Sequence, residues 1–311
     1  MKKYLLKGFI IGLVGIVFIS CKGKDQPASK TPEFIQFRLK PDIGKVYSYQ
    51  LLNESEMEQE VNDETYDNNS KLEMDVDYTF SKDTASVLKL TMQYKKFKLS
   101  MKVMGQEKEL DASTAASSFE QSDKMFAAFH NAEVIATVDS FGTASSFSGV
   151  EAIKNKMNEY AGSDEEARQM LNGSIRQYVS DAFFKQSIEA SFKAFTDRKL
   201  RIGDTIMVST PVGGELNITV SAIYKLESVK NSIANISTTA NIDIKDQPIT
   251  IESTNLTANI AGKQTCIVKI NIYSGLLEES KSELNLKGVM QTMGTEIPFK
   301  MKAKNLVRLI N

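Results

Sequence analysis

Residues 71–80 read KLEMDVDYTF and alternate between apolar and polar side chains. Apolar side chains occupy every second position from Leu72 to Tyr78, and acidic side chains occupy the positions between them, from Glu73 to Asp77. Successive side chains of a β-strand point to opposite faces, so this period of two predicts a strand with one buried and one solvated face.

The same period extends upstream and downstream of this stretch. Residues 54–60 place a glutamate at every second position, and residues 300–304 do the same with lysine. Charge ladders of this kind are typical of a solvated sheet face, which we prefer to the alternative of a cation or basic-partner site. After Leu200 the pattern predicts strands over 205–209, 216–226, 232–244, 249–260, 264–273, 276–287 and 296–309. The turns between them are predicted at Gly213-Gly214, Asp246–Pro248, Gly262, Ser274-Gly275 and Met293-Gly294.

A helical period interrupts the strands between the two β blocks. Val150, Ile153, Met157 and Tyr160 recur at helical spacing, and Gly162 follows as a stop signal. Residues 163–166, SDEE, predict a second helix start, and helical patterning continues to about residue 195. The sequence therefore predicts an α+β fold, mostly β, with long curved antiparallel sheets and a helical segment inserted at about 150–195.

The two β blocks resemble each other. An apolar residue followed by Ile-Gly precedes a strand at Leu39–Gly44 and again at Leu200–Gly203. Tyr78–Leu90 also matches Tyr224–Ile236 without a gap. Two related halves would explain these matches, and chance similarity between alternating strands is the alternative.

The N-terminus has the three parts of an export signal. Three lysines lie within the first seven residues, and residues 9–19 are apolar and uncharged. Eleven residues are too few to span a bilayer, which needs about twenty, but they suit a secretory signal. Phe18-Ile19-Ser20-Cys21 resembles a bacterial lipobox, which implies lipid attachment to Cys21. An ordinary secretory signal with a chance cysteine is the alternative.

These features predict the order of segments along the chain. The predicted segments are a lipoprotein signal peptide at 1–20, lipidated Cys21 and a flexible tether at 21–33, an N-terminal antiparallel β block at 34–149, a helical segment at 150–197 and a C-terminal antiparallel β block at 198–311. Lys22, rather than aspartate, follows the cysteine and favours the outer membrane over the inner one. The expected location is the cell envelope, and the sequence does not distinguish between the periplasmic face and the cell surface.

Composition argues against several functions. The net charge of −1 offers no concentrated basic face for nucleic acid. With one histidine and two cysteines, the chain has little material for a metal centre or a histidine-based hydrolase. Cys266 shares its strand face with Val268 and Ile270, which predicts a buried thiol. We expect no catalytic residues, cofactor or metal. An active site built from carboxylates alone is the alternative that the sequence leaves.

The lipobox, a body of about 290 residues and the Ile202-Gly203-Asp204 opening of the second block together resemble an uncharacterised family of Bacteroidota lipoproteins. Long antiparallel strands with inserted helices are also distantly similar to half-barrel lipoprotein carriers of the bacterial envelope. The first resemblance implies no established function. It does imply that Thr84 and Thr205, in Asp-Thr-apolar tripeptides, are candidate O-glycosylation acceptors.

Two functions follow from these observations. The first is a lipid-anchored, non-catalytic structural or binding module of the envelope, with an envelope protein as partner. The second is a carrier or sensor of an apolar ligand, such as a lipid or fatty acid, held between the curved sheet and the helices. The candidate lining residues of such a site are Phe183, Phe184, Phe192 and Phe195. Packing onto the sheet is the alternative role for these rings.

Overall fold

The computed structural model describes residues 33–61, 64–84, 87–103, 105–172, 179–192, 198–212, 218–251, 254–292 and 295–311. Several predictions fall outside these ranges. They are the signal peptide at 1–20, Cys21, the tether as far as residue 32, Phe195, and the turns at Gly213-Gly214 and Met293-Gly294.

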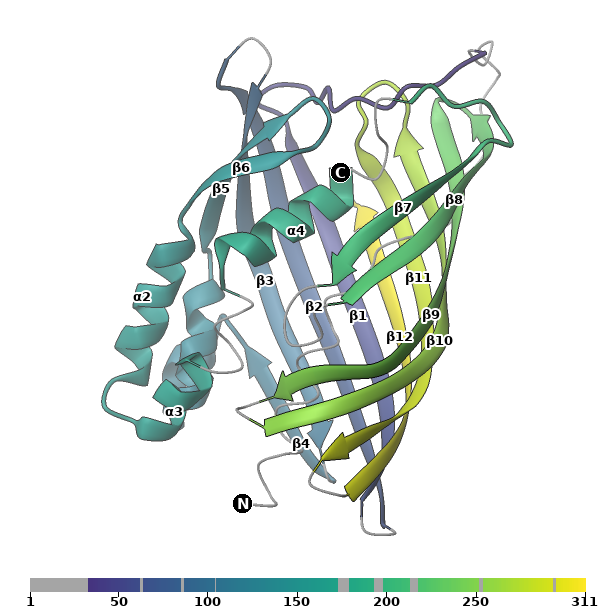
Figure 1. Ribbon diagram of the computed structural model, residues 1–311. Coiled ribbons are helices and arrows are strands. Elements are labelled where there is room, and N and C mark those ends of the chain that lie inside the picture. Colours follow the sequence, from purple (N-terminus) through teal and green to yellow (C-terminus); the bar gives the residue numbers. More distant parts are fainter. Residues whose placement is uncertain are drawn as a thin grey trace.

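The described residues form one open, strongly curved antiparallel sheet (Figure 1). Its strands are β1 (Val46–Val61), β2 (Glu64–Lys82), β3 (Val87–Val103), β4 (Gln106–Asp111), β5 (Glu133–Asp139), β6 (Ala144–Ser148), β7 (Thr205–Val212), β8 (Ile218–Lys230), β9 (Ile233–Ile251), β10 (Thr254–Asn271), β11 (Leu277–Thr292) and β12 (Thr295–Leu309). Their order is β6-β5-β3-β2-β1-β12-β11-β10-β9-β8-β7, and β4 pairs with β3. The predicted α+β, mostly β class is confirmed.

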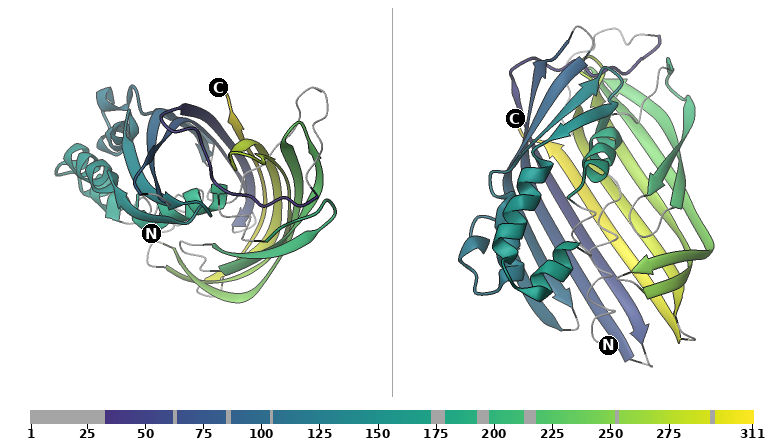
Figure 2. Two further views of the ribbon diagram at one scale, coloured as in Figure 1. Left: turned by 90° about the horizontal axis from the view of Figure 1, so that it is seen from above. Right: turned by 60° about the vertical axis from the view of Figure 1, so that its left-hand side comes forward.

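The described helices are η1 (Ala115–Ser117), α1 (Gln121–Lys124), η2 (Met125–Phe129), α2 (Val150–Ala161), α3 (Glu165–Met170) and α4 (Asp181–Phe192). Helix α4 crosses the open side of the sheet, and the other helices gather beside the edge formed by β4–β6 (Figures 1 and 2). As the sequence predicts, α2 ends just before Gly162. The Asp164 side chain caps α3 by accepting a hydrogen bond from the Ala167 backbone N–H at 2.8 Å.

The two β blocks join into one sheet where β1 pairs with β12. On the concave face Met57 lies opposite Met301. On the convex face the glutamates of β1 lie opposite the lysines of β12, as in the 2.7 Å ion pair between Glu58 and Lys300. The sequence predicted each charged row but not that the two rows face each other.

Two predicted turns are wrong because strands continue through them. β9 passes through residues 246–248 with a bulge opposite Asn259, whose Oδ1 accepts a hydrogen bond from the Asp246 backbone N–H at 3.0 Å. β10 passes through Gly262, where a Cβ atom would lie 2.2 Å from the carbonyl oxygen of Asn285. Here glycine permits a close approach of β11 rather than a turn.

Matching hydrogen bonds occur in the two halves. The Gly44 backbone N–H donates to the Phe80 carbonyl at 2.8 Å, and the Gly203 N–H donates to the Leu226 carbonyl at 2.7 Å. Both glycines have positive φ and precede the first strand of their half. These bonds join positions that the proposed duplication aligns, so they are consistent with two related halves.

Residues 33–45, here called the strap, cross the upper end of the sheet in Figure 1. The strap is an extended segment, with a bridge between Ile35 and Leu200 beside the β7 edge. Further along, the Lys40 N–H donates to the Ser274 carbonyl at 2.7 Å, and the Leu39 N–H donates to the Ser140 carbonyl at 2.9 Å. The strap therefore links both sides of the open sheet.

Gly275 gives a direct test of the strap. At its φ of +69° an alanine Cβ would lie 2.2 Å from the Arg38 carbonyl oxygen of the strap. We expect Gly275→Ala to lower the free energy of unfolding by about 3 to 4 kcal/mol, from left-handed strain plus overpacking. Urea denaturation followed by circular dichroism would measure the loss.

Gly44→Ala is the matched control. Gly44 has a similar φ of +80°, but a Cβ there meets no atom within 4 Å. We expect a loss of about 1 to 2 kcal/mol from backbone strain alone. Equal losses in the two variants would contradict the close contact between Gly275 and the strap.

Candidate ligand-binding trough

The upper part of the concave face is packed against helix α4. Phe184 and Phe192 of α4 are buried, and the Phe192 ring lies 6.1 Å from that of Phe80 and 6.3 Å from that of Tyr78. Phe183 is half-buried, with its ring 5.7 Å from the Phe184 ring. The three described phenylalanines of the predicted lining therefore belong to, or pack on, one apolar cluster, here called the upper cluster. Their contact with a ligand stays a prediction.

A second apolar cluster occupies the lower part of the same face. This lower cluster is formed by buried side chains of β1 and β9–β12. Its members are Met57, Ile242, Leu256, Ala258, Ile260, Leu284, Leu286, Met290, Phe299, Met301 and Ala303. In Figure 1 the lower ends of β9 and β10 curl across this part of the sheet. The lower cluster is therefore buried by the curved strands themselves, and each of its members is at most 8% exposed.

A polar row separates the two clusters. Five neighbouring strands place a polar side chain at one level of the concave face, and the register pairs are continuous from β1 to β9. The members of the row are Asn53, Asn305, Ser282, Cys266 and Thr238. Asn53 Nδ2 donates to Asn305 Oδ1, and Asn305 Nδ2 donates to Ser282 Oγ at 3.0 Å. A hydrogen-bonded belt thus crosses an otherwise apolar surface.

Buried polar atoms without partners flank this row. Asn53 Oδ1, Gln264 Nε2 and Ser280 Oγ are buried and have no hydrogen-bond partner in the described part of the chain. Gln264 lies one level below the row and Ser280 one level above it. Burying an unpaired polar group costs about 1 to 3 kcal/mol, so these three atoms are ready partners for a hydrogen-bonding ligand.

Alternation places apolar or neutral polar side chains on the concave face of β1 and β9–β12, and the exception is Glu278 of β11, whose charge acts on the buried Tyr49. Burial raises the pKa of the Cys266 thiol to about 12, although the Thr238 hydroxyl beside it lowers that pKa. Burial also raises the pKa of Tyr224 to about 12. Both groups are therefore neutral at pH 7, and the predicted buried thiol of Cys266 is confirmed.

A cavity of about 510 Å³ opens at the lower end, among β1, β2 and β9–β12. Ile260 and Phe299 of the lower cluster contribute to it, but most of its lining belongs to the convex face, including Lys245, Lys287 and Val289. Glu58 and Lys300, an ion pair of the convex face, also line it. The volume falls within the range of about 300 to 1,000 Å³ found for small-molecule sites.

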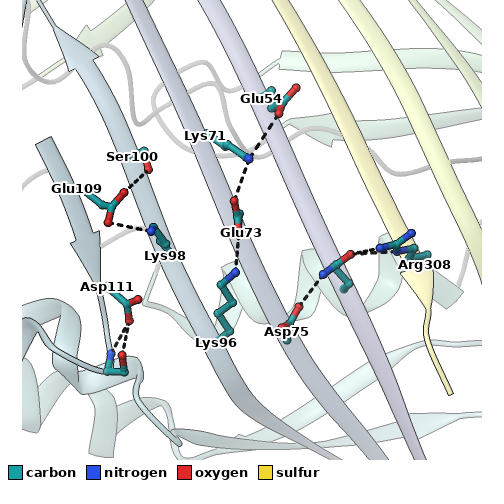
Figure 3. A network of polar contacts seen from close by, with 12 residues as sticks. Glu54, Lys71, Glu73, Asp75, Lys96, Lys98, Ser100, Glu109, Asp111 and Arg308 are labelled. Carbon is teal, nitrogen blue, oxygen red and sulfur yellow. Dashed lines mark hydrogen bonds and ion pairs between the residues drawn. The ribbon is translucent and has the colours of Figure 1, made fainter. Parts of the chain in front are cut away.

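The convex face is covered by alternating charges (Figure 3). On β2, Glu73 lies between Lys71, at 2.9 Å, and Lys96. Lys71 also approaches Glu54 at 4.0 Å, and Lys98 pairs with Glu109 of β4 at 2.8 Å. The network therefore runs across four strands, which supports the interpretation of the charge ladders as a solvated face.

The structure also locates the two predicted O-glycosylation residues. Thr84 and Thr205 are exposed, the first after β2 and the second at the start of β7. The described residues contain no group of three or more metal-ligating side chains. None of the described helices is long and apolar enough to cross a membrane.

The sequence analysis missed the polar row. A signal was present, because Asn53 and Ser55 interrupt the apolar side of β1, and Ser280 and Ser282 interrupt that of β11. Each interruption alone looks like ordinary variation in a strand. Only the register between strands places them at one level.

These features define a class of protein: an open half-barrel of antiparallel strands with a mainly apolar concave face and a charged convex face. Residues 85–277, more than half of the chain, match the family of unknown function DUF6263. The chain belongs to this family. An uncharacterised family is therefore confirmed, while the assignment to Bacteroidota lipoproteins stays a prediction.

Solved structures give only distant likenesses. Lipovitellin, in a structure described for its lipid–protein interactions, is 11% identical, with a TM-score of 0.48 over 87% of this chain and 25% of lipovitellin. The chain thus spans about a quarter of lipovitellin. An outer membrane channel from Pseudomonas putida F1 is 7% identical, with a TM-score of 0.22 over 91% of this chain and 100% of the channel. At these TM-scores neither likeness supports a functional argument. No curated protein sequence matches the chain.

The convex network predicts a dependence of stability on pH. The ammonium groups of Lys96 and Lys71 lower the pKa of Glu73 from 4.5 to about 2. Because the folded-state pKa is lowered, this contribution to stability is complete above the unfolded pKa of about 4.5. It is lost as the pH falls through about 2.

We therefore expect the urea midpoint of the wild type to fall between pH 4.5 and pH 2 more steeply than that of Glu73→Gln. Urea titrations at half-unit pH intervals would measure both slopes. Parallel curves would show that the two lysines do not stabilise the Glu73 carboxylate.

Proposed function

We propose that this protein is a non-catalytic binding module that holds an apolar or amphiphilic molecule on its concave face. The observation that supports this best is the concave surface of β1 and β9–β12, which is lined by apolar side chains and by three buried polar atoms without partners in the described part of the chain. Such a surface favours long apolar molecules, because burying apolar area contributes about 25 cal/mol per Å². The polar row and its unpaired flanking atoms suit a neutral hydrogen-bonding group on the same ligand.

The proposed location is the cell envelope, most simply the outer membrane, with a lipid on Cys21 as anchor. This part rests on the sequence, where a basic segment, an apolar run and Phe18-Ile19-Ser20-Cys21 follow one another. In that setting the protein would carry or sense a lipid or fatty acid. No cofactor or catalytic group is required for this function.

A second function, docking of an envelope protein, is favoured by one observation. Met207 and Ile223 are cross-strand partners on β7 and β8, and they are 72% and 54% exposed. β7 is also an edge strand, whose outer backbone groups are open to strand addition. This function would become the leading one if the concave face takes no apolar ligand.

The ligand proposal predicts a difference between two neighbouring residues of β12. Met301 lies in the lower cluster, whereas Lys302 points to the convex face. We expect Met301→Gln to weaken binding of a dansyl-labelled long-chain fatty acid about tenfold, because an amide on an apolar contact surface costs about 1 to 3 kcal/mol. Fluorescence titration of a chain beginning at residue 22, purified without detergent, would measure the affinity.

Lys302→Gln introduces the same side chain on the opposite face and should leave the affinity within about twofold. Thermal melts of both variants would confirm that they fold. Met57→Gln, opposite Met301 in the register, provides a second variant with the same expected loss. If the wild type takes up no fatty acid, or if both β12 variants bind equally, the trough is not the ligand site.

The anchor proposal predicts that Cys21→Ser abolishes incorporation of a radiolabelled fatty acid and releases the protein from the membrane fraction. Cys266→Ser is the matched control, because it removes the second of the two cysteines and leaves the lipobox intact. Labelling should persist in that control. Membrane association of Cys21→Ser at the wild-type level would overturn the anchor.

A further inference from the structure

The exposed apolar side chains of this protein are concentrated at one end of the sheet. Of the eleven large apolar side chains that are exposed in the described part of the chain, seven lie at the upper end, on the strap, the adjoining turns and the strand ends. These seven, here called the rim, are Phe34, Ile43, Val46, Phe141, Ile202, Tyr273 and Ile310. Ile202 is 53% exposed and Tyr273 is 64% exposed. This clustering distinguishes the rim from singly scattered apolar residues, which need no explanation.

Backbone contacts place the rim residues at one end of the molecule although they are distant in sequence. The strap, with Phe34 and Ile43, bonds to Leu200 and Ser274, which lie next to rim residues of two other segments. The Leu39 N–H donates to the Ser140 carbonyl, directly before Phe141. Ile310 reaches the same end because its N–H donates to the Ser48 carbonyl at 2.8 Å.

Cations lie over aromatic rings along the same rim. The guanidinium carbon of Arg38 lies 4.0 Å from the Phe141 ring centroid, and that of Arg201 lies 4.3 Å from the Phe34 ring centroid. Lys45 Nζ lies 5.0 Å from the ring centroid of Tyr47, just inside the rim. Aromatic rings beside long basic side chains are typical of protein surfaces at the membrane interface, where the rings enter the headgroup region and the cations meet lipid phosphates.

The position of the N-terminal tether supports the same orientation. The described chain begins at Glu33 on the strap. The twelve residue steps from Cys21 to Glu33 can span at most about 40 Å, at about 3.3 to 3.6 Å per residue. β1 alone, with 16 residues, extends the sheet about 50 Å away from the rim. An anchor at Cys21, which is part of the proposed function, would therefore hold the rim nearest to the bilayer.

We infer that the rim is a membrane-docking surface that inserts its apolar side chains into a lipid headgroup layer. In this orientation the upper end of the trough faces the bilayer and the lower end faces away from it. The side chains of the rim can reach lipid without any anchor, because they are exposed on the folded body. The inference concerns membrane contact and does not require that the trough holds a ligand.

The chain offers a clean optical test because it contains no tryptophan. A chain beginning at residue 22 keeps every described residue and lacks the lipidation site. We expect Tyr273→Trp in this chain to show a blue shift of about 10 nm or more in emission on addition of phosphatidylglycerol–phosphatidylcholine vesicles. Phe119→Trp places the reporter on an exposed apolar site between η1 and α1, in a segment that the rim does not include, and should show no shift.

Vesicle flotation tests whether the rim supplies the affinity. We expect Ile202→Ser combined with Tyr273→Ser to lower the partition coefficient at least tenfold. The matched pair, Phe119→Ser with Ile267→Ser, removes two exposed apolar side chains that are not part of the rim and should change it less than twofold. Equal losses in the two pairs, or a wild-type chain that neither floats nor shifts, would overturn the inference.

The fatty-acid titration separates this inference from the proposed function. The Ile202→Ser and Tyr273→Ser chain should keep its affinity for the dansyl fatty acid within twofold, since neither residue lies in the lower cluster. A chain that floats on vesicles but takes up no fatty acid supports the rim and refutes the trough. The reverse result supports the trough and refutes the rim.

Discussion

The pairing of β1 with β12 is the constraint on which the rest of this structure depends. It joins residues about 250 positions apart, as in the hydrogen bond from Arg308 to Gln50. Apolar partners such as Met57 and Met301 set its register on one face, and glutamate–lysine pairs set it on the other. A slip by one residue would exchange the two faces of a strand and place glutamates in the trough. Both faces of the protein therefore follow from this register.

The division between the two faces also explains how a protein without obvious catalytic groups can have a specific surface. The convex charges neutralise one another in ladders, so they provide solubility more than recognition. The concave face has no such ladders along β1 and β9–β12 and offers apolar contact together with a few unpaired hydrogen-bonding atoms. Recognition on that face would depend on shape and on neutral polar groups, which short sequence motifs do not encode.

The sequence was sufficient to predict local secondary structure, but it did not predict how distant strands pair. Alternation in residues 71–80 and helical spacing from Val150 to Tyr160 predicted strand and helix correctly, because each pattern depends on neighbouring residues. The turn predicted at Gly262 is wrong, because this glycine allows the neighbouring strand β11 to approach closely and the chain does not reverse there. The polar row and the β1–β12 pairing depend on residues hundreds of positions apart. No local pattern contains that information.

The strap has a mechanical consequence for a tethered protein. A pull on the chain at Glu33 would load its ion pair with Arg201, at 3.4 Å, and then the two hydrogen bonds between Ile35 and Leu200, each 2.8 Å long. Those bonds lie outside the strand ladders, so they can break while every pair from β1 to β12 stays intact. Under tension from the membrane, the strap would therefore detach from the sheet before the sheet itself unfolds.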